Sequence, residues 1–213
     1  MTNQPIAVDI VLIPSPDIIS FAIEMNRKII AETAVSPIIL GKTKMIPHIS
    51  VCMCTLAKNT DILIENLRDI ADKYLPLPIT ISGIQTVTTA SGDLITGLEI
   101  HRSDDLFALH TEVMQAAAPF FGRTITPDML ALGTDEELAP FTIPYITHFA
   151  SHSSYDQYHP HITLGYEQSI REHDMSRYPV TCTGTTLAVC HLGNHCTCHS
   201  VIYSFKNERP LVT

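Results

Sequence analysis

One five-residue pattern occurs twice in the chain, and it constrains the fold more than any other feature of the sequence. Pro47–Val51 and Pro160–Leu164 both read Pro, His, Ile, a hydroxyl residue and an aliphatic residue, and their histidines, His48 and His161, are 113 residues apart. Each copy opens a segment with the apolar, β-branched composition of a strand. Side chains of a strand alternate between its faces, so each histidine shares a face with the hydroxyl residue two positions later. The repeat predicts two related halves, each presenting an imidazole beside a hydroxyl.

Regular apolar patterns around the two copies predict further strands and helices. Runs rich in Val, Ile, Thr and Tyr between Pro, Gly or Asn predict strands, and apolar residues spaced by three or four positions predict helices. Strands are expected at 6–13, 46–56, 79–90, 94–101, 161–167, 179–190 and 197–206. Helices are expected at about 18–31, 61–74 and 104–118.

Residues 120–159 follow neither pattern and contain several prolines and scattered aromatic residues. We expect an insertion here, because loops of this length in compact domains are often lids or binding loops. The alternative is an irregular surface insertion without a chemical role. The aromatic residues would either stack on a nucleobase or pack the loop down; they are Phe141, Tyr145, Phe149, Tyr155 and Tyr158.

The residue types of the repeated pattern suit cleavage of a phosphodiester by general acid–base catalysis. If both strands face one pocket, one neutral imidazole of the pair His48 and His161 accepts a proton from the attacking oxygen, and the other, protonated, donates one to the leaving oxygen. Ser50 and Thr163 then donate hydrogen bonds to the non-bridging oxygens. This scheme requires no metal and no cofactor. The alternative is that the two histidines end unrelated strands and satisfy local hydrogen bonds.

The paired words His48–Ser50 and His161–Thr163 resemble the two signature motifs of the two-histidine (2H) phosphoesterase superfamily. The branch that they resemble most is the bacterial 2′-5′ RNA ligase and cyclic phosphodiesterase group. An opening strand followed by a proline and a helix is similar to that group, and so is a last hairpin closing on Tyr203–Phe205. The resemblance implies a single bilobal α+β domain over residues 1–213, with 120–159 as an insertion. Each of its two pseudo-symmetric lobes has an antiparallel sheet flanked by helices, and the active-site cleft lies between them.

The resemblance also implies an enzyme that opens or hydrolyses 2′,3′-cyclic or 2′-5′ phosphodiesters of small nucleotides or RNA ends without a metal. Where the family's reverse reaction applies, the same residues would perform 2′-5′ RNA ligation. Only four residues are carried over, His48 and His161 as catalytic and Ser50 and Thr163 as phosphate-binding. The first motif has Ser where Thr is commoner in the family, which keeps the hydroxyl and loses a methyl group.

The charge of the chain limits the kind of nucleic acid that it could hold. The formal net charge is −9, from 13 Lys and Arg against 22 Asp and Glu. Proteins that bind long nucleic acids neutralise many phosphates with Lys and Arg, which this chain cannot do over a wide surface. We therefore expect a small nucleotide or an RNA terminus as the substrate.

The N-terminus and the cysteines indicate a cytoplasmic protein. The apolar run 6–13 is too short to span a membrane and lacks the flanks of a signal peptide. We therefore expect the six cysteines to be reduced thiols. The alternation of Cys52 with Cys54 and of Cys196 with Cys198 suits one face of a strand better than a disulfide.

Two alternative functions remain open from the sequence. The first is a zinc-dependent hydrolase that uses a C-terminal cluster, Cys190, His191, His195, Cys196, Cys198 and His199. A hairpin in this region would scatter those positions over two faces and a turn, which favours ordinary strand residues. The second is a non-catalytic module that binds an RNA end in the same cleft.

Overall fold

The computed structural model describes residues 4–33, 37–57, 60–88, 92, 94–166 and 178–207. The strands are β1 (Ile6–Pro14), β2 (Ile49–Leu56), β3 (Leu77–Thr88), β4 (Leu94–Ile100), β5 (His161–Tyr166), β6 (Val180–Leu192) and β7 (Cys198–Phe205). The helices are α1 (Pro16–Thr33), α2 (Asp61–Tyr74), α3 (Asp104–Ala117) and α4 (Thr142–His152). Every strand pairing is antiparallel, which confirms the predicted α+β class. The expected strand ends at 89–90 and 167 lie outside the described residues.

Strand β6 joins the two halves of the molecule into one seven-stranded sheet of order β2-β1-β6-β3-β4-β5, with β7 also paired to β6. Its later part pairs with β1 and β7, and its first part, Val180–Gly184, pairs with β3. Gly184 marks the crossing, because it is opposite both Pro14 and Leu77. A Cβ at this glycine would approach the buried Leu12 side chain to 2.8 Å. One half is therefore β2-β1-β6-β7 and the other β6-β3-β4-β5.

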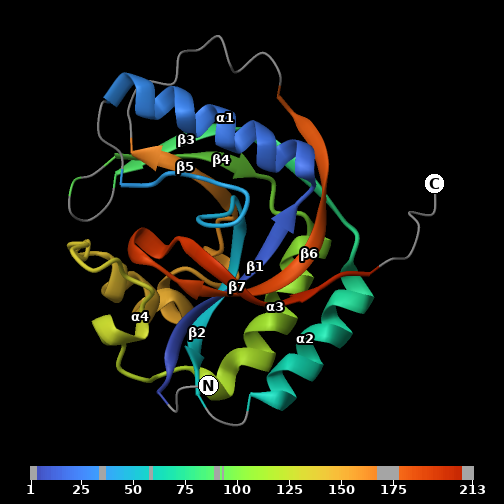
Figure 1. Cartoon of the computed structure of the whole chain (residues 1–213). Coiled ribbons are helices and arrows are strands. Elements are labelled where there is room, and N and C mark those ends of the chain that lie inside the picture. Colours follow the sequence, from blue (N-terminus) through green and yellow to red (C-terminus); the bar gives the residue numbers. More distant parts are fainter. Residues whose placement is uncertain are drawn as a thin grey trace.

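The two motif strands are the outer strands at opposite ends of this sheet order, yet they contact each other. The sheet must therefore curve until β2 and β5 approach (Figure 1). The Tyr158 hydroxyl, just before β5, donates a hydrogen bond to the carbonyl of Ser50 in β2 at 3.1 Å. The two copies of the pattern therefore come together because the sheet curves, since β2 and β5 do not pair with each other in the sheet order.

Helices bury one face each against the curved sheet and hold its two halves. Helix α1 packs on β5, while α2 and α3 pack on each other and on the half that contains β2 and β7 (Figure 1). In α3 the buried side chains recur at helical spacing: Leu106, Leu109, His110, Val113, Met114 and Ala117. Burying one large aliphatic side chain contributes about 1.5–3 kcal/mol, so such faces fix the helices firmly.

The irregular structure expected for residues 120–159 is wrong for residues 142–152, which form α4. Its buried positions, Thr142, Ile146 and Phe149, have helical spacing and pack toward β2. Pro144 lies in the first turn, where a missing N–H costs no intrahelical hydrogen bond. The helical period was obscured because aromatic and β-branched residues are modest helix formers and prolines surround the segment.

The expectation of reduced thiols is wrong for one pair, because Cys190 and Cys198 form a disulfide. They lie on the neighbouring strands β6 and β7 with their Cα atoms 5.4 Å apart, within the range that a disulfide spans. The spacing of Cys196 and Cys198 indicates only how these two cysteines lie relative to each other, whereas Cys198 bonds to Cys190 across the hairpin. The other four cysteines are free thiols.

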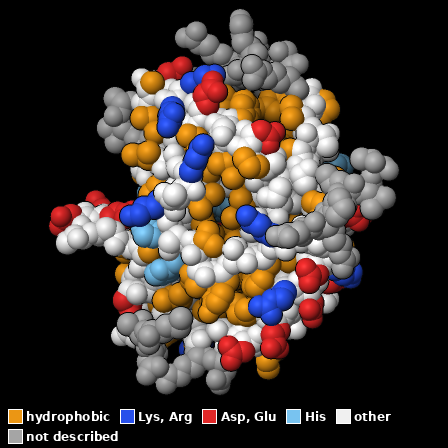
Figure 2. Space-filling view, turned by 45° about the vertical axis from the view of Figure 1, so that its right-hand side comes forward, with side chains coloured by type: hydrophobic (Ala, Val, Ile, Leu, Met, Phe, Trp, Pro, Cys, Tyr) orange, Lys and Arg blue, Asp and Glu red, His pale blue; other side chains and the backbone are white. Residues whose placement is uncertain are grey.

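The described surface carries no long basic tract on the face in view. Lys and Arg side chains there are separated from one another and mixed with acidic and apolar ones (Figure 2). Among the described helices, none is both long and apolar enough to cross a lipid bilayer.

Candidate active site

The four residues of the repeated pattern line one cavity of about 480 Å³, here called the histidine cavity. His48 immediately precedes β2, Ser50 lies at the start of that strand, and His161 and Thr163 lie in β5. The residue between each pair, Ile49 or Ile162, is fully buried on the opposite face. The alternation predicted from the sequence therefore holds in both copies. A second cavity of about 410 Å³, the side cavity, shares Ser50 and His161 with the first.

Both histidines are held by the same local hydrogen bond. His48 Nδ1 donates to the carbonyl of Ile46 at 2.7 Å, and His161 Nδ1 donates to the carbonyl of His159 at 2.9 Å. A carbonyl only accepts, so Nδ1 carries the proton and a neutral ring has its lone pair on Nε2. Each imidazole is thus oriented by the backbone two residues earlier, which leaves Nε2 as the nitrogen for an ion pair or a proton transfer.

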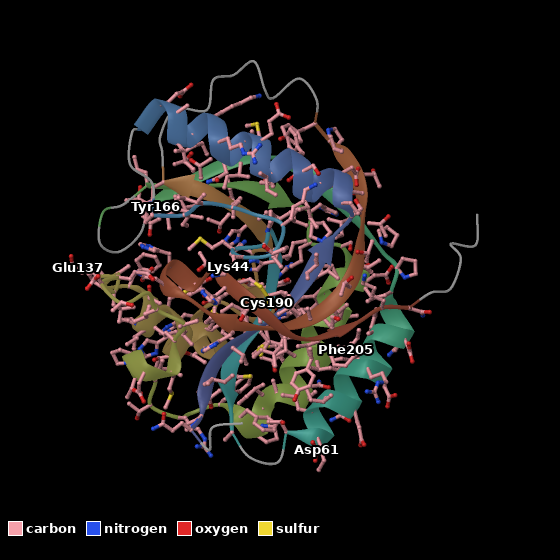
Figure 3. The ribbon with its side chains drawn as sticks, in the orientation of Figure 1. Lys44, Asp61, Glu137, Tyr166, Cys190 and Phe205 are labelled. Atoms are coloured by element: carbon pink, nitrogen blue, oxygen red, sulfur yellow. A yellow bond between two sulfur atoms is a disulfide. The ribbon has the colours of Figure 1, made fainter. Side chains whose placement is uncertain are left out.

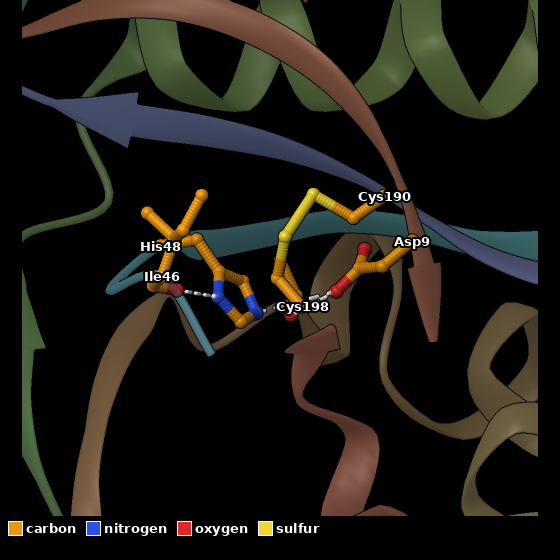
Figure 4. Close-up of a disulfide and its surroundings, with 6 residues drawn as sticks. Asp9, Ile46, His48, Cys190 and Cys198 are labelled. Atoms are coloured by element: carbon orange, nitrogen blue, oxygen red, sulfur yellow. Dashed lines mark hydrogen bonds and ion pairs between the residues drawn. A yellow bond between two sulfur atoms is a disulfide. The ribbon is translucent and has the colours of Figure 1, made fainter. Parts of the chain in front are cut away.

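A buried carboxylate distinguishes the two histidines. Asp9, fully buried in the middle of β1, has Oδ2 3.6 Å from His48 Nε2 and accepts a 2.6 Å hydrogen bond from the Ser50 hydroxyl. Its other oxygen, Oδ1, has no hydrogen-bond partner among the described residues. Asp9 is opposite Cys190 in the β1–β6 pairing, so the disulfide lies beside this pair (Figure 4). An unsatisfied buried carboxylate oxygen costs stability, which indicates a functional role.

The two imidazoles are shifted in opposite directions. Burial opposes protonation of His48, but the hydrogen bond and charge of Asp9, together with the Ile46 carbonyl, outweigh it and raise the pKa of His48. Burial lowers the pKa of His161, and the charge of His48 adds to this effect against the His159 carbonyl. Burial also raises the pKa of Asp9, against its bonds to His48 and Ser50. At any one pH, His48 is therefore protonated to a greater extent than His161.

The two motif hydroxyls differ in their surroundings. Ser50 uses its one proton on Asp9, so a hydrogen bond from Ser50 to a phosphate would require the hydroxyl to turn away from the carboxylate. The Thr163 hydroxyl lines the histidine cavity without a hydrogen-bond partner in the described part of the chain. Thr163 is thus the readier of the two predicted phosphate donors.

Comparison with known proteins places this geometry in a family. Residues 41–191 match the family model of the 2′-5′ RNA ligase superfamily, and this match includes both histidine motifs and all of residues 120–159. The chain belongs to the 2′-5′ RNA ligase superfamily. No curated protein sequence matches the chain.

Solved structures resemble this superfamily member at low sequence identity. TT0787 of Thermus thermophilus has a TM-score of 0.51 and 10% identity, over 96% of this chain and 100% of that one, which shows the fold. E. coli LigT complexed with NADP+ has a TM-score of 0.49 and 13% identity, over 97% of this chain and 100% of that one. A structure described as a phosphoesterase has a TM-score of 0.48 and 12% identity, with coverage of 97% and 100%.

Sequence reasoning missed Asp9, although it is the one charged residue in the apolar run 6–13. A charged residue inside a buried strand is rarely tolerated without a partner, so the presence of Asp9 in this run could have indicated a site.

Sequence reasoning also missed His110 of α3, a buried histidine that stacks on Tyr158 with ring centroids 3.9 Å apart. His110 Nδ1 donates to the carbonyl of Val51 at 2.8 Å, and its Nε2 accepts from the backbone N–H of Tyr155 at 2.9 Å. This ring ties the end of the insertion to β2.

His110 should make stability depend on pH. Burial lowers its pKa to about 4, below the value of about 6.5 for an exposed histidine. The folded state thus holds the neutral ring, so its contribution is complete above pH 6.5 and is lost as the pH falls from 6.5 toward 4. The unfolding free energy measured with urea should decline over this interval, and in His110→Gln the decline should be smaller. An equal decline in both proteins would contradict this assignment.

The C-terminal Cys and His residues do not converge on a metal site. Cys190 and Cys198 are bonded to each other, His191 Nε2 donates to the carbonyl of Met129, and His195 Nδ1 contacts the Tyr166 hydroxyl at 2.6 Å. Within the described ranges, no group of three or more His, Cys, Asp or Glu side chains is arranged to hold a metal ion. The hairpin and the turn between its strands spread these residues over different surroundings.

Two of the five aromatic residues of the insertion are buried and serve the core: Phe149 and Tyr158. Phe141 and Tyr145 line the histidine cavity, and Tyr145 also lines the side cavity. Tyr166, at the end of β5, and Glu137, shortly before α4, both lie on the left side of the view in Figure 3. Phe149 and Tyr158 also line the side cavity, so both cavities offer aromatic rings to a bound molecule.

Proposed function

We propose that this superfamily member is a metal-independent phosphodiesterase that opens or hydrolyses 2′,3′-cyclic or 2′-5′ phosphodiesters of small nucleotides or RNA ends. The observation that carries the proposal is the pair of imidazoles of His48 and His161, which line one cavity. Each ring forms the same kind of Nδ1 hydrogen bond to the backbone, and the pKa values of the two rings are shifted in opposite directions. Two titratable groups whose surroundings push their pKa values apart are the mark of an acid and a base in one site.

The directions of the two shifts assign the roles. In hydrolysis of a 2′,3′-cyclic phosphate, His161 Nε2 accepts a proton from water as the water oxygen bonds to phosphorus. The bond from phosphorus to one ribose oxygen breaks, and His48 Nε2 donates its proton to that oxygen. Proton exchange with solvent then restores both rings. In 2′-5′ ligation a 5′-hydroxyl would take the place of water, so each histidine would keep its role. Cleavage of a 2′-5′ linkage, in which the 3′-hydroxyl attacks phosphorus and the 5′-oxygen leaves, is the reverse of that ligation, and there the roles exchange.

Two further groups support this chemistry. Asp9 stabilises protonated His48 and so keeps the general acid charged before the reaction. The Thr163 hydroxyl donates to a non-bridging oxygen, where negative charge develops; loss of one such preorganised donor typically costs about 10²–10³ in rate. Ser50 supports Asp9 and contacts the phosphate only after rotation of its hydroxyl.

The decisive experiment is turnover of nucleoside 2′,3′-cyclic monophosphates and a 2′-5′ linked dinucleotide by the purified protein in excess EDTA. We expect hydrolysis of at least one of them at a rate that EDTA does not change. Activity that EDTA abolishes and zinc restores would overturn the mechanism in favour of a zinc hydrolase. Binding of both compounds without turnover would overturn it in favour of an RNA-end-binding module.

A further inference from the structure

One face of α4 carries four residues that point to the same cavity as the two motif histidines. Phe141, immediately before the helix, and Tyr145, His148 and His152 within it recur at intervals of four, three and four residues, which is one side of an α-helix. All four line the histidine cavity. The helix therefore forms a wall of the site, built by residues 120–159, with the side that is adjacent to its buried face on β2.

Among the described residues that line the two cavities, histidines are the only side chains that can carry a positive charge. The lining of the histidine cavity and the side cavity, as far as the structure describes it, contains no Lys, Arg, Asp or Glu. Six of the eleven histidines of the chain line the two cavities: His48, His148, His152, His159, His161 and His195. Any phosphate held here must be bound by imidazolium, by neutral N–H and O–H donors, or by both.

The pair His148 and His152 is placed to bind an anion without taking part in the acid–base step. Their rings have centroids 5.3 Å apart, and both side chains are exposed. Neither ring forms a hydrogen bond or ion pair with another described residue, whereas His48, His161 and His195 each use Nδ1. Two rings this close can each donate an N–H to the same bound phosphate.

We propose that His148 and His152 form a second phosphate subsite, so that the substrate carries another phosphate besides the one attacked. This inference rests on the proposed function and names its substrate class: nucleotides with a 2′,3′-cyclic or 2′-5′ diester and a 5′-phosphate. The cavity of about 480 Å³ is within the size range of pockets that bind small molecules. Histidines at this i, i+4 spacing also ligate metals, but the described residues supply no third ligand beside them.

The test is calorimetric binding, in excess EDTA, of adenosine 3′-phosphate and adenosine 3′,5′-bisphosphate. Both ligands offer one phosphate to the motif histidines, and only the second offers another to α4. We expect the bisphosphate to bind at least about tenfold more tightly, as a charge-assisted contact would give. In His148→Gln/His152→Gln this ratio of dissociation constants should fall toward one. In His101→Gln, an exposed histidine that lines neither cavity, the ratio should stay as in the unaltered protein.

Equal affinity for the two ligands, or a ratio that survives the double substitution, would overturn the subsite. Its failure is distinguishable from failure of the proposed function, because binding does not require turnover. Absence of hydrolysis together with a ratio that depends on His148 and His152 would overturn the proposed function and leave the subsite standing. Hydrolysis together with equal dissociation constants for the two ligands would support the proposed function and overturn the subsite.

Discussion

His161→Ala is expected to lower kcat/KM for hydrolysis of a nucleoside 2′,3′-cyclic phosphate by about 10²–10⁴, and His48→Ala by a similar factor. Each substitution removes one of the two proton transfers and leaves the cavity lined by the other groups. Both side chains are only partly buried at the cavity surface, so the fold should persist. The measurement is kcat/KM in excess EDTA, with circular dichroism and a thermal melt of each variant.

The double variant gives a second expectation. An acid and a base that act in the same step lose most of their effect when either is removed, so His48→Ala/His161→Ala should be little slower than either single variant. His101→Ala, an exposed histidine outside both cavities, is the matched control and should retain full activity. A single variant that keeps more than about a tenth of the activity would remove that histidine from the acid–base pair.

The placement of the two histidines could be predicted largely because a strand has a period of two. The pattern His, Ile, hydroxyl requires only that each copy be a strand, and the buried Ile49 and Ile162 confirm this locally in both. The meeting of β2 and β5 is different, because it depends on the strand order and on the curvature of the whole sheet. No local pattern encodes that order, and it followed only from the family resemblance.

The features that the sequence did not predict have a common physical cause, because each of them depends on contacts between segments that are distant in the sequence. Asp9 gains its role only when β1 lies beside the start of β2, and Cys190 finds Cys198 only across a hairpin. Helix α4 is stabilised by burial of Ile146 and Phe149, and its sequence has weak intrinsic helix preference. Tertiary packing therefore determined each of these features more strongly than local sequence did.

Asp9→Asn is expected to move the alkaline limb of the kcat/KM profile to lower pH. In the unaltered protein kcat/KM should rise as His161 loses its proton, below about pH 6.5, and fall as His48 loses its proton, above about pH 6.5. Asparagine keeps the shape of Asp9 and can still accept the Ser50 hydrogen bond, but it removes the charge that raises the pKa of His48. On the alkaline side, kcat/KM should fall about tenfold for each unit by which the limb moves.

The pH profile separates this role from a merely structural one. Loss of packing would lower activity at every pH, whereas loss of the charge should leave the acid limb nearly in place, since Asp9 contributes less to His161 than burial does. Stability should not fall, because the substitution removes a buried carboxylate with one unsatisfied oxygen. Asp69→Asn, which removes an exposed carboxylate from α2, is the matched control and should leave both limbs unchanged. An alkaline limb that stays in place in Asp9→Asn would show that Asp9 does not set the protonation of His48, and the assignment of His48 as general acid would lose its main support.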